Sequence, residues 1–541
     1  MVQSILALTY LTVPTSQLTE AVTVLVSVTY LFHCQNDFYD CLHKCCSQGG
    51  FFVSNSSSEF KVVDANGKPY NRLLLIITML IGTFSTFIVQ TTLTTAFPTL
   101  MRTFNIDADS VQWLTTGFML AMGITIPISA FLLQRYSSKA LYLTAMAIFF
   151  VGTFICMIAP TFGVLLAGRL IEAVAVGITA PTFQTTMLTI FPPERRGSAM
   201  GLAGIVIGLA PAIGPTLSGW LLLNYSWRAL FVVILPFPVI VFTLAIFTMR
   251  KIFPTKKTSA DWVSVALSTI GFGSMLYAFS SVGSSSWTAP KVYITLIIGF
   301  VFVGLFIWRS LTIENPLLQL RVFKSPIYTL SVIEVAVVNM AMMGAEMVVP
   351  LYIQTVRGES AFHSGLILLP GALMMGIMSP ITGRIFDRIG ARRLAITGMF
   401  LLTIGTAFFV TLTETTPIIF VTILYTIRMF GISMVMMPVT TTGMNALPLS
   451  LMSHGTSVNN TGRQVFSSMG TAILISVLTN VTNSNMPAKS LLHSTPLTYG
   501  THALSATLAG YHAAFLTATI FALIGLVLAF RIKPGNLRRR G

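Results

Sequence analysis

Apolar runs recur along the 541-residue chain, separated by short charged or Pro/Gly-rich breaks. An apolar run of about 20 residues is long enough for one helix to cross the hydrocarbon core of a bilayer. Only 9% of the residues carry charge, against about 25% in ordinary soluble domains. A soluble fold of this composition could not cover its surface with polar groups. We therefore expect an all-α polytopic membrane protein, with the lipid bilayer as its solvent.

The runs predict fourteen transmembrane helices. They are expected near residues 73–97, 111–133, 140–159, 161–188, 198–221, 227–249, 262–282, 292–311, 325–353, 364–384, 393–412, 416–443, 457–480 and 511–531. With both termini inside, the inner segments hold 23 Lys and Arg residues and the outer segments hold five. This excess is what the positive-inside rule predicts for the cytoplasmic side. The net charge of +16 thus belongs to alternating loops, and we expect no nucleic-acid partner.

Two pairs of segments repeat about 255 residues apart. SAFLLQRYSSK (129–139) corresponds to TGRIFDRIGARR (382–393), and GRLIEAVAVGITAP (168–181) corresponds to IRMFGISMVMMP (427–438). The repeat predicts two six-helix bundles, at 61–250 and 325–531, with two inserted central spans in 251–324. A basic cytoplasmic tail is expected at 532–541.

Residues 1–60 share neither the repeat nor the motifs of the remaining chain. We expect an extension without function, or one wrongly assigned to the chain; a re-entrant or additional span is the alternative. Four cysteines and two histidines cluster between His33 and Cys46. Their spacing fits no standard zinc pattern, so we expect no metal, and we expect no cofactor.

The fifth expected span has small residues and prolines in a regular pattern. Gly201, Ala210, Gly214-Pro215 and Ser218-Gly219 would let helices approach closely, and the prolines would bend the helix. A packed Gly-rich helix without a special role is the alternative.

The loop after the tenth expected span contains Gly383, Asp387, Arg388, Gly390 and Arg392. We expect Asp387 to pair with an arginine or to cap a helix N-terminus, which would hold an inward gate closed. Charges that only set the topology are the alternative, but these would not explain the Asp or the glycines.

These stretches resemble the signatures of the fourteen-span drug:proton antiporters of the major facilitator superfamily, the EmrB/QacA type. The resemblance covers about residues 70–535 and includes the segment Asn460-Thr461-Gly462-Arg463-Gln464 that opens the thirteenth expected span. It implies the major facilitator fold, with a binding site between the two bundles near the midplane. It also identifies the fifth-span pattern as the antiporter motif and Asp387 as part of the gating loop. Arg463 is expected at a membrane boundary, where its side chain would snorkel.

Seven positions depart from the family pattern. At four of them a glycine is replaced, namely at Ala130, Ser137, Ala210 and Ser218. Gln134 stands where the first-half loop usually has an Asp, so a charge-based latch is not expected there. Gln90 stands where many relatives have an Asp in the first span. A glutamine cannot carry a proton, so we expect Gln90 to bind substrate or a neighbouring helix. Glu172 replaces the usual Gln of the fourth span.

Three acids, Glu172, Glu334 and Glu346, are expected well inside spans, where an ionisable residue is a functional candidate. We expect coupling protons on these residues, with Glu172 first. Arg169, at i and i+3, shares its helix face and can pair with it; a structural salt bridge is the alternative. Glu334 is the second choice and Glu346 the third, and Arg428, the counterpart of Arg169, is a further charge partner.

The sequence therefore predicts a secondary transporter of the cell membrane that exports amphipathic, cationic or neutral drugs by proton exchange. The first alternative is an exporter of one physiological lipid, siderophore or metabolite. A membrane enzyme is more distant, because no P-loop, HExxH or nucleophile motif occurs and the outer loop expected at 481–510 lacks clustered catalytic residue types. A channel is equally distant, because no filter-like segment occurs. No obligate protein partner is inferred.

Overall fold

The computed structural model describes residues 64, 67, 69–253, 255, 261–282, 286–314, 316–488 and 496–532. Within these residues, fourteen helical segments are long and apolar enough to cross a membrane. The predicted number of spans is therefore confirmed. The expectations for residues 1–60 and for the tail at 533–541 lie outside the described residues, and the boundaries expected for the bundles remain predictions.

The helices fall into three groups along the chain, which we call the first half, the inserted pair and the second half. The first half contains α4 (Arg72–Thr92), α5 (Phe97–Phe104), α6 (Ala108–Arg135), α7 (Ser138–Ile158), α8 (Phe162–Ile190), α9 (Arg196–Asn224), α10 (Ala229–Ile234) and α11 (Pro236–Thr248). The inserted pair is α12 (Trp262–Ser281) and α13 (Pro290–Thr312). The second half contains α14 (Pro326–Thr355), α15 (Ala361–Ile389), α16 (Ala391–Ala407), α17 (Ile418–Asn445), α18 (Met452–Asn485) and α20 (Pro496–Arg531).

Short polar residues begin many of these helices. Each accepts a hydrogen bond from the backbone N–H three residues further on, which satisfies one of the free donors of the first turn. The caps of this kind are Asn71, Asp107, Ser137, Thr161, Asp261, Ser325 and Ser360.

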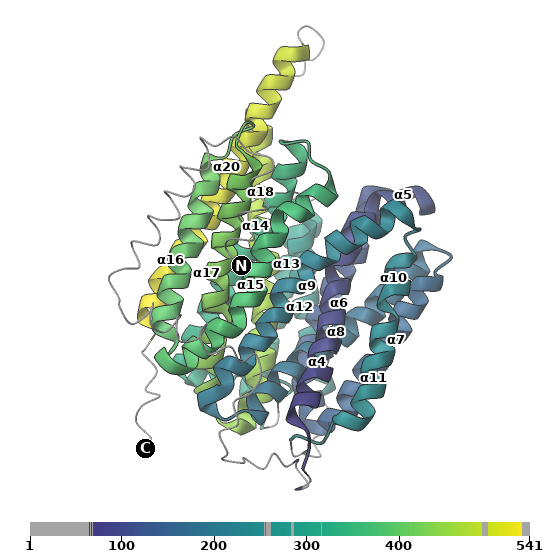
Figure 1. The fold of residues 1–541 in the computed structure, drawn as a ribbon, viewed down its shortest axis with the longest axis vertical. Coiled ribbons are helices and arrows are strands. Elements are labelled where there is room, and N and C mark those ends of the chain that lie inside the picture. Colours follow the sequence, from purple (N-terminus) through teal and green to yellow (C-terminus); the bar gives the residue numbers. More distant parts are fainter. Residues whose placement is uncertain are drawn as a thin grey trace, which may run out of the picture. The chain divides into compact units, whose positions relative to one another are not determined.

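The two halves meet mainly through α9 and α15, and secondly through α6 and α18. In Figure 1 the purple and blue helices of the first half lie beside the green and yellow helices of the second. Glycines of α9 make the close approach possible. A Cβ atom on Gly201 would lie 2.6 Å from the carbonyl oxygen of Ser379, and one on Gly208 would lie 2.9 Å from the Met375 side chain.

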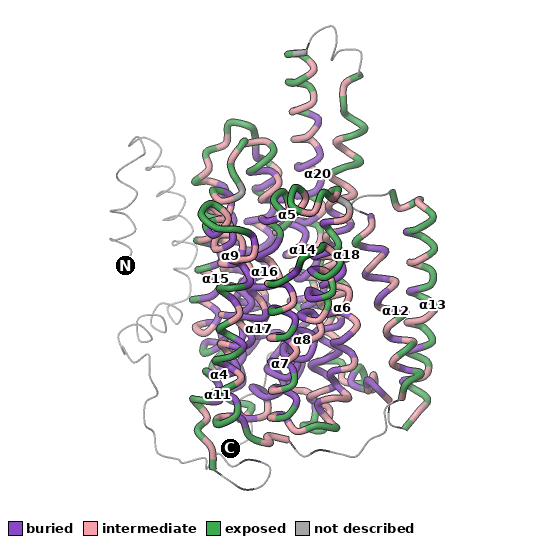
Figure 2. Tube along the Cα trace, turned by 90° about the vertical axis from the view of Figure 1, so that its right-hand side faces the viewer, coloured by how far each residue is buried: buried purple, intermediate pink, exposed green. Residues whose placement is uncertain are grey.

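The inserted pair covers the contact between α6 and α18. Helix α12 packs on both, whereas α13 packs chiefly on α12 and is mostly exposed, as Figure 2 shows. The Arg309 guanidinium donates two hydrogen bonds of 2.9 Å to Asp261, which joins the ends of the pair. These bonds hold the pKa of Asp261 at about 2, below its ordinary value.

The last two spans are longer than predicted. We expected an outer loop at 481–510, but α18 continues to Asn485 and α20 begins at Pro496. Each helix is about 50 Å long, against about 30 Å for a hydrocarbon core. Their upper ends extend past the neighbouring helices in Figure 1. The interpretation of this segment as a loop was wrong, because its polar residues continue a helical pair.

Candidate functional site

The first half buries an ion pair between α8 and its neighbours. Arg169 and Glu172 are both fully buried, and their side chains lie 2.8 Å apart, so the pairing expected from their i, i+3 spacing is confirmed. Thr153 of α7 donates a 2.8 Å hydrogen bond to the other carboxylate oxygen. Arg169 also donates to the carbonyl of Val89 in α4, at 3.2 Å, and lies over the Phe118 ring. Both oxygens of Glu172 are therefore satisfied.

The second half buries the corresponding arginine, which forms no ion pair with a described residue. Arg428 of α17 donates to the carbonyl oxygens of Ala341 and Met342 in α14, at 2.6 and 3.1 Å. It also donates to the Thr406 hydroxyl of α16, at 3.2 Å. The position that corresponds to Glu172 in the repeat is Gly431. Carbonyl oxygens thus take the place of the carboxylate.

Helix α14 carries the other two predicted acids. Glu334 is fully buried, and neither of its carboxylate oxygens has a hydrogen-bond partner. Glu346 is partly exposed, and its charge interacts with that of Arg428. Twelve residues separate the two acids, which places them about 120° apart around the helix. The described structure therefore gives the three predicted acids three different surroundings.

Gln90 lies on α4, next to Val89, and is partly exposed. It therefore lies beside the carbonyl that receives the Arg169 guanidinium. The structure thus brings Arg169 and Glu172 together, and Gln90 is the sequence neighbour of a residue that bonds to Arg169.

The segment predicted as the gating loop is helical except at Gly390, because α15 continues to Ile389 and α16 begins at Ala391; the expectation of a loop was wrong there. Its acid contacts the start of α9. Asp387 accepts hydrogen bonds of 2.8 Å from the backbone N–H groups of Gly197 and Ser198, and a further bond from the Ser198 hydroxyl. A carboxylate at a helix N-terminus is stabilised by free N–H groups and by the helix dipole. The expected capping contact is therefore present, and it joins the two halves.

The other members of the loop have separate positions. Gly383 packs on Gly197, where a Cβ atom would lie 2.3 Å from a carbonyl oxygen. Gly390 ends α15 at a φ of 79°, a conformation that favours glycine. The side chains of Arg388 and Arg392 are exposed. The two glycines are thus explained by backbone geometry.

The predicted antiporter motif faces two helices. Gly201 packs on α15, as described above, and Gly214 packs on α4, where a Cβ atom would lie 2.2 Å from the Thr91 hydroxyl. Gly219 lies beside Phe362 of α15. Pro215 is inside α9 and removes one backbone hydrogen bond. The glycines of the motif therefore let α9 pack closely on α4 of its own half and on α15 of the second half.

We call the helix ends that carry the basic loops the inner ends. Several hydrogen bonds join the halves there, in addition to those of Asp387. They connect Ser129 with Ser457, Gln134 with His454, Gln184 with Asn460, and Arg196 with Asn445. The inner ends of the two halves are therefore closed on each other in this structure.

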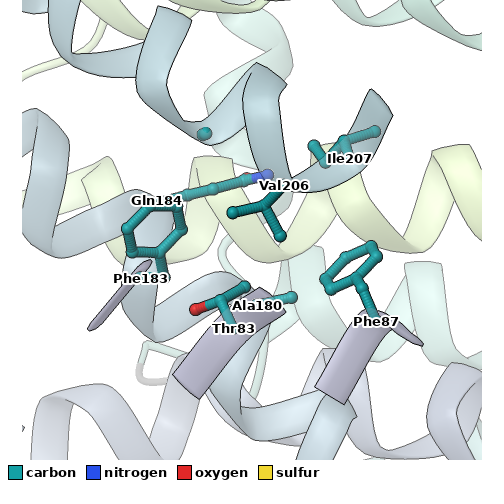
Figure 3. A pocket seen from close by; sticks show the side chains of 8 residues that line it. Thr83, Phe87, Ala180, Phe183, Gln184, Val206 and Ile207 are labelled. Atoms are coloured by element: carbon teal, nitrogen blue, oxygen red, sulfur yellow. The ribbon is translucent and has the colours of Figure 1, made fainter. Parts of the chain in front are cut away.

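A small pocket lies between α4, α8 and α9, with room for about one water molecule. Figure 3 shows Phe87 and Phe183 on opposite sides of it, with Gln184 above them. The Gln184 amide oxygen accepts the 2.8 Å hydrogen bond from Asn460 of α18. An apolar wall of the first half thus adjoins a polar contact between the halves.

Arg463 is a residue whose position was predicted wrongly. We expected it at a membrane boundary, but α18 begins at Met452, which places Arg463 about 16 Å along the helix. The polar residues before it are buried, so they belong to the helix and not to a loop. Their burial between the halves could not be recognised from an apolar run.

Comparison with known proteins agrees with this geometry. Residues 79–471 match the family model described as Major Facilitator Superfamily. The uncharacterized MFS-type transporter YcnB of Bacillus subtilis is 48% identical over 466 residues, which cover 86% of this chain and 96% of YcnB. The lincomycin resistance protein LmrB of Listeria monocytogenes is 39% identical over 472 residues, which cover 87% and 98%.

A solved structure has the same fold. The crystal structure of the human organic anion transporter MFSD10 (TETRAN) aligns with a TM-score of 0.59 at 12% identity, over 84% of this chain and 99% of that chain. The fourteen spans, the repeated buried arginines and the family match lead to one conclusion. The chain belongs to the Major Facilitator Superfamily, and it is a multi-pass membrane transporter of small molecules and not an enzyme.

Proposed function

We propose that the protein is a proton-driven exporter of amphipathic organic compounds that works by alternating access in the cell membrane. Both termini are proposed to lie in the cytoplasm, in agreement with the basic inner loops. The relative LmrB is named a lincomycin resistance protein, which supports drug export. An exporter of one physiological lipid, siderophore or metabolite remains the alternative, because the same fold would serve it.

The surroundings of Glu334 carry the proposal of proton coupling. An ionised carboxylate at this position would be a buried charge without a hydrogen bond, which costs several kcal/mol. We infer that Glu334 carries a proton in this conformation and releases it when the second half rearranges. Glu172 has a satisfied ion pair instead. Our proposal therefore places Glu334 before Glu172, with Glu346 and its interaction with Arg428 as a further candidate.

The closed inner ends support alternating access. Asp387 holds the start of α9 with charge-assisted hydrogen bonds. When these bonds break, the inner ends of α9 and α15 can separate. Gln90, Arg169 and Arg428 are proposed to line or to bias the substrate path between the halves.

The test is dye accumulation in intact cells that express the protein, with and without a protonophore. We expect low accumulation of an amphipathic dye, and a rise to the level of empty cells when the proton gradient is collapsed. A matched Asp387→Asn strain controls for expression. Low accumulation that persists with the protonophore, at unchanged ATP levels, would contradict proton coupling.

A further inference from the structure

Helix α18 changes its surroundings abruptly at Gly462. The eight residues 454–461 are all buried, whereas none of the eight residues 462–469 is buried. Eight residues make more than two turns, so this accessible stretch includes every side of the helix. Seven of these residues are partly buried and Phe466 is exposed, so the side that faces the first half is partly accessible, and Arg463 lies near the start of the stretch.

The contacts of neighbouring residues show which side of α18 carries Arg463. Asn460, three residues earlier on the same face, bonds to Gln184 of α8 across the contact between the halves. Gln464, the next residue, lies beside Gly123 of α6, where a Cβ atom would be 3.4 Å from its side chain. Gly470, seven residues after Arg463 on nearly the same face, packs on Met340 of α14. Arg463 is thus placed between the side of α18 that faces the first half and the side that packs on α14, one turn further from the inner ends than Asn460.

Arg463 has no partner among the described residues. Its Nε atom is buried without a hydrogen bond, and the ion pairs of the described residues do not include it. One turn earlier, Asn459 is buried with its Nδ2 atom unpaired. A guanidinium has five donors and no acceptor. Arg169 and Arg428 also have unpaired guanidinium nitrogens, but each bonds to described protein acceptors through its other nitrogens, which Arg463 does not.

The acids of α14 do not reach this guanidinium. Val332 of α14 lies near Gly462, at 3.9 Å from an added Cβ atom. Glu334 is two residues further, about 200° around the helix, on the opposite side. Glu346 lies about 21 Å further along the helix axis. The buried Nε donor of Arg463 has no acceptor among the described residues, and a buried donor without a hydrogen bond costs free energy, so a ligand can supply the acceptor that the protein does not.

We propose that Arg463, with Asn459 beside it, binds an anionic group of the transported molecule, such as a carboxylate. The planar guanidinium matches a carboxylate with two parallel hydrogen bonds. The substrate class is then amphipathic compounds with an anionic end, and not the cationic or neutral compounds expected from the sequence. This inference rests on the proposed function of export, but it concerns binding alone.

The test uses two dyes with the same xanthene ring and opposite charge, fluorescein and rhodamine 6G. Binding to the purified full-length protein is measured by fluorescence anisotropy in phosphatidylcholine nanodiscs, without a proton gradient. We expect Arg463→Gln to weaken fluorescein binding at least tenfold and to leave rhodamine 6G binding unchanged or tighter. Arg463→Lys should lose less, because it keeps the charge but not the planar fork. Arg393→Gln, an exposed variant in the first turn of α16, should bind both dyes as the wild type does.

Four results would overturn the proposal. Fluorescein could fail to bind the wild type, or Arg463→Gln could bind it normally. Equal loss of both dyes, in a variant with unchanged unfolding temperature, would assign Arg463 a structural role. Loss of fluorescein binding when phosphatidylglycerol is added would assign the site to a lipid headgroup. Dye accumulation insensitive to a protonophore would instead remove the proposed driving force and leave the binding result intact.

Discussion

The two halves of the molecule bury the same arginine in different ways. In both, the guanidinium bonds to a carbonyl in the first helix of its half, Val89 in α4 and Ala341 in α14. The first half adds Glu172 at 2.8 Å. The second half has its buried acid, Glu334, on α14 without a hydrogen-bond partner. The comparison shows that the repeat keeps the arginine, whereas the surroundings of the buried acid differ between the halves.

The largest effect on export is expected from substitution of Glu334, the acid without a hydrogen-bond partner. In Glu334→Gln the amide imitates a carboxyl that never releases its proton. We predict that export driven by a pH gradient in proteoliposomes falls about tenfold or more, while downhill drug movement remains. Normal pumping by Glu334→Gln, together with failure of Glu172→Gln, would return the coupling role to the first half.

A second comparison concerns the two contacts that Asp387 and Gln134 make between the halves at their inner ends. Asp387→Asn removes a charge from the start of α9, and a charged hydrogen bond contributes about 1.5–3 kcal/mol. We predict about a tenfold loss of export rate with unchanged folding, measured as initial efflux at equal expression. The matched variant is Gln134→Asp in the other half, where Gln134 contacts His454, and its effect should be modest. Equal rates for Asp387→Asn and wild type would exclude the latch.

A smaller effect on export is expected from substitution of Glu172, the acid that is paired with Arg169. In Glu172→Gln the single amide oxygen can still accept from Arg169, but the amide NH2 replaces the oxygen that accepts from Thr153, and the arginine is no longer neutralised. We predict a stability loss of about 2–4 kcal/mol, seen as a lower unfolding temperature. Proton-driven export should stay within about threefold of wild type. If coupling is lost while stability is unchanged, Glu172 carries the proton after all.

The smallest effect is expected in the inserted pair, outside both halves. Arg309 lowers the pKa of Asp261 to about 2. A lowered pKa stabilises the folded state above the unfolded value of about 4, and this contribution is lost as pH falls through about 2. Asp261→Asn should therefore cost about 1 kcal/mol, constant from pH 5 to 8 in thermal unfolding. A cost that varies across this range would show that another group titrates.

Much of the site follows from local spacing. The pairing of Arg169 with Glu172 could be predicted because residues three apart share a helix face. The contact of Asp387 with a helix start could be predicted because carboxylates favour N–H groups there. The identity of that helix, α9, could not, because Gly197 and Asp387 come from different halves of the chain.

The sequence by itself determined the membrane environment, the fourteen spans and the repeat. Apolar length and charge asymmetry act locally along the chain, so they are readable without contacts. Only the tertiary structure decided which charged groups have partners. In the sequence, Arg463 and Glu334 cannot be told apart from Arg169 and Glu172, because all four are ionisable residues in or near predicted spans. Their difference arises from which other helices bring acceptors or donors to them, and those helices lie far away in the chain.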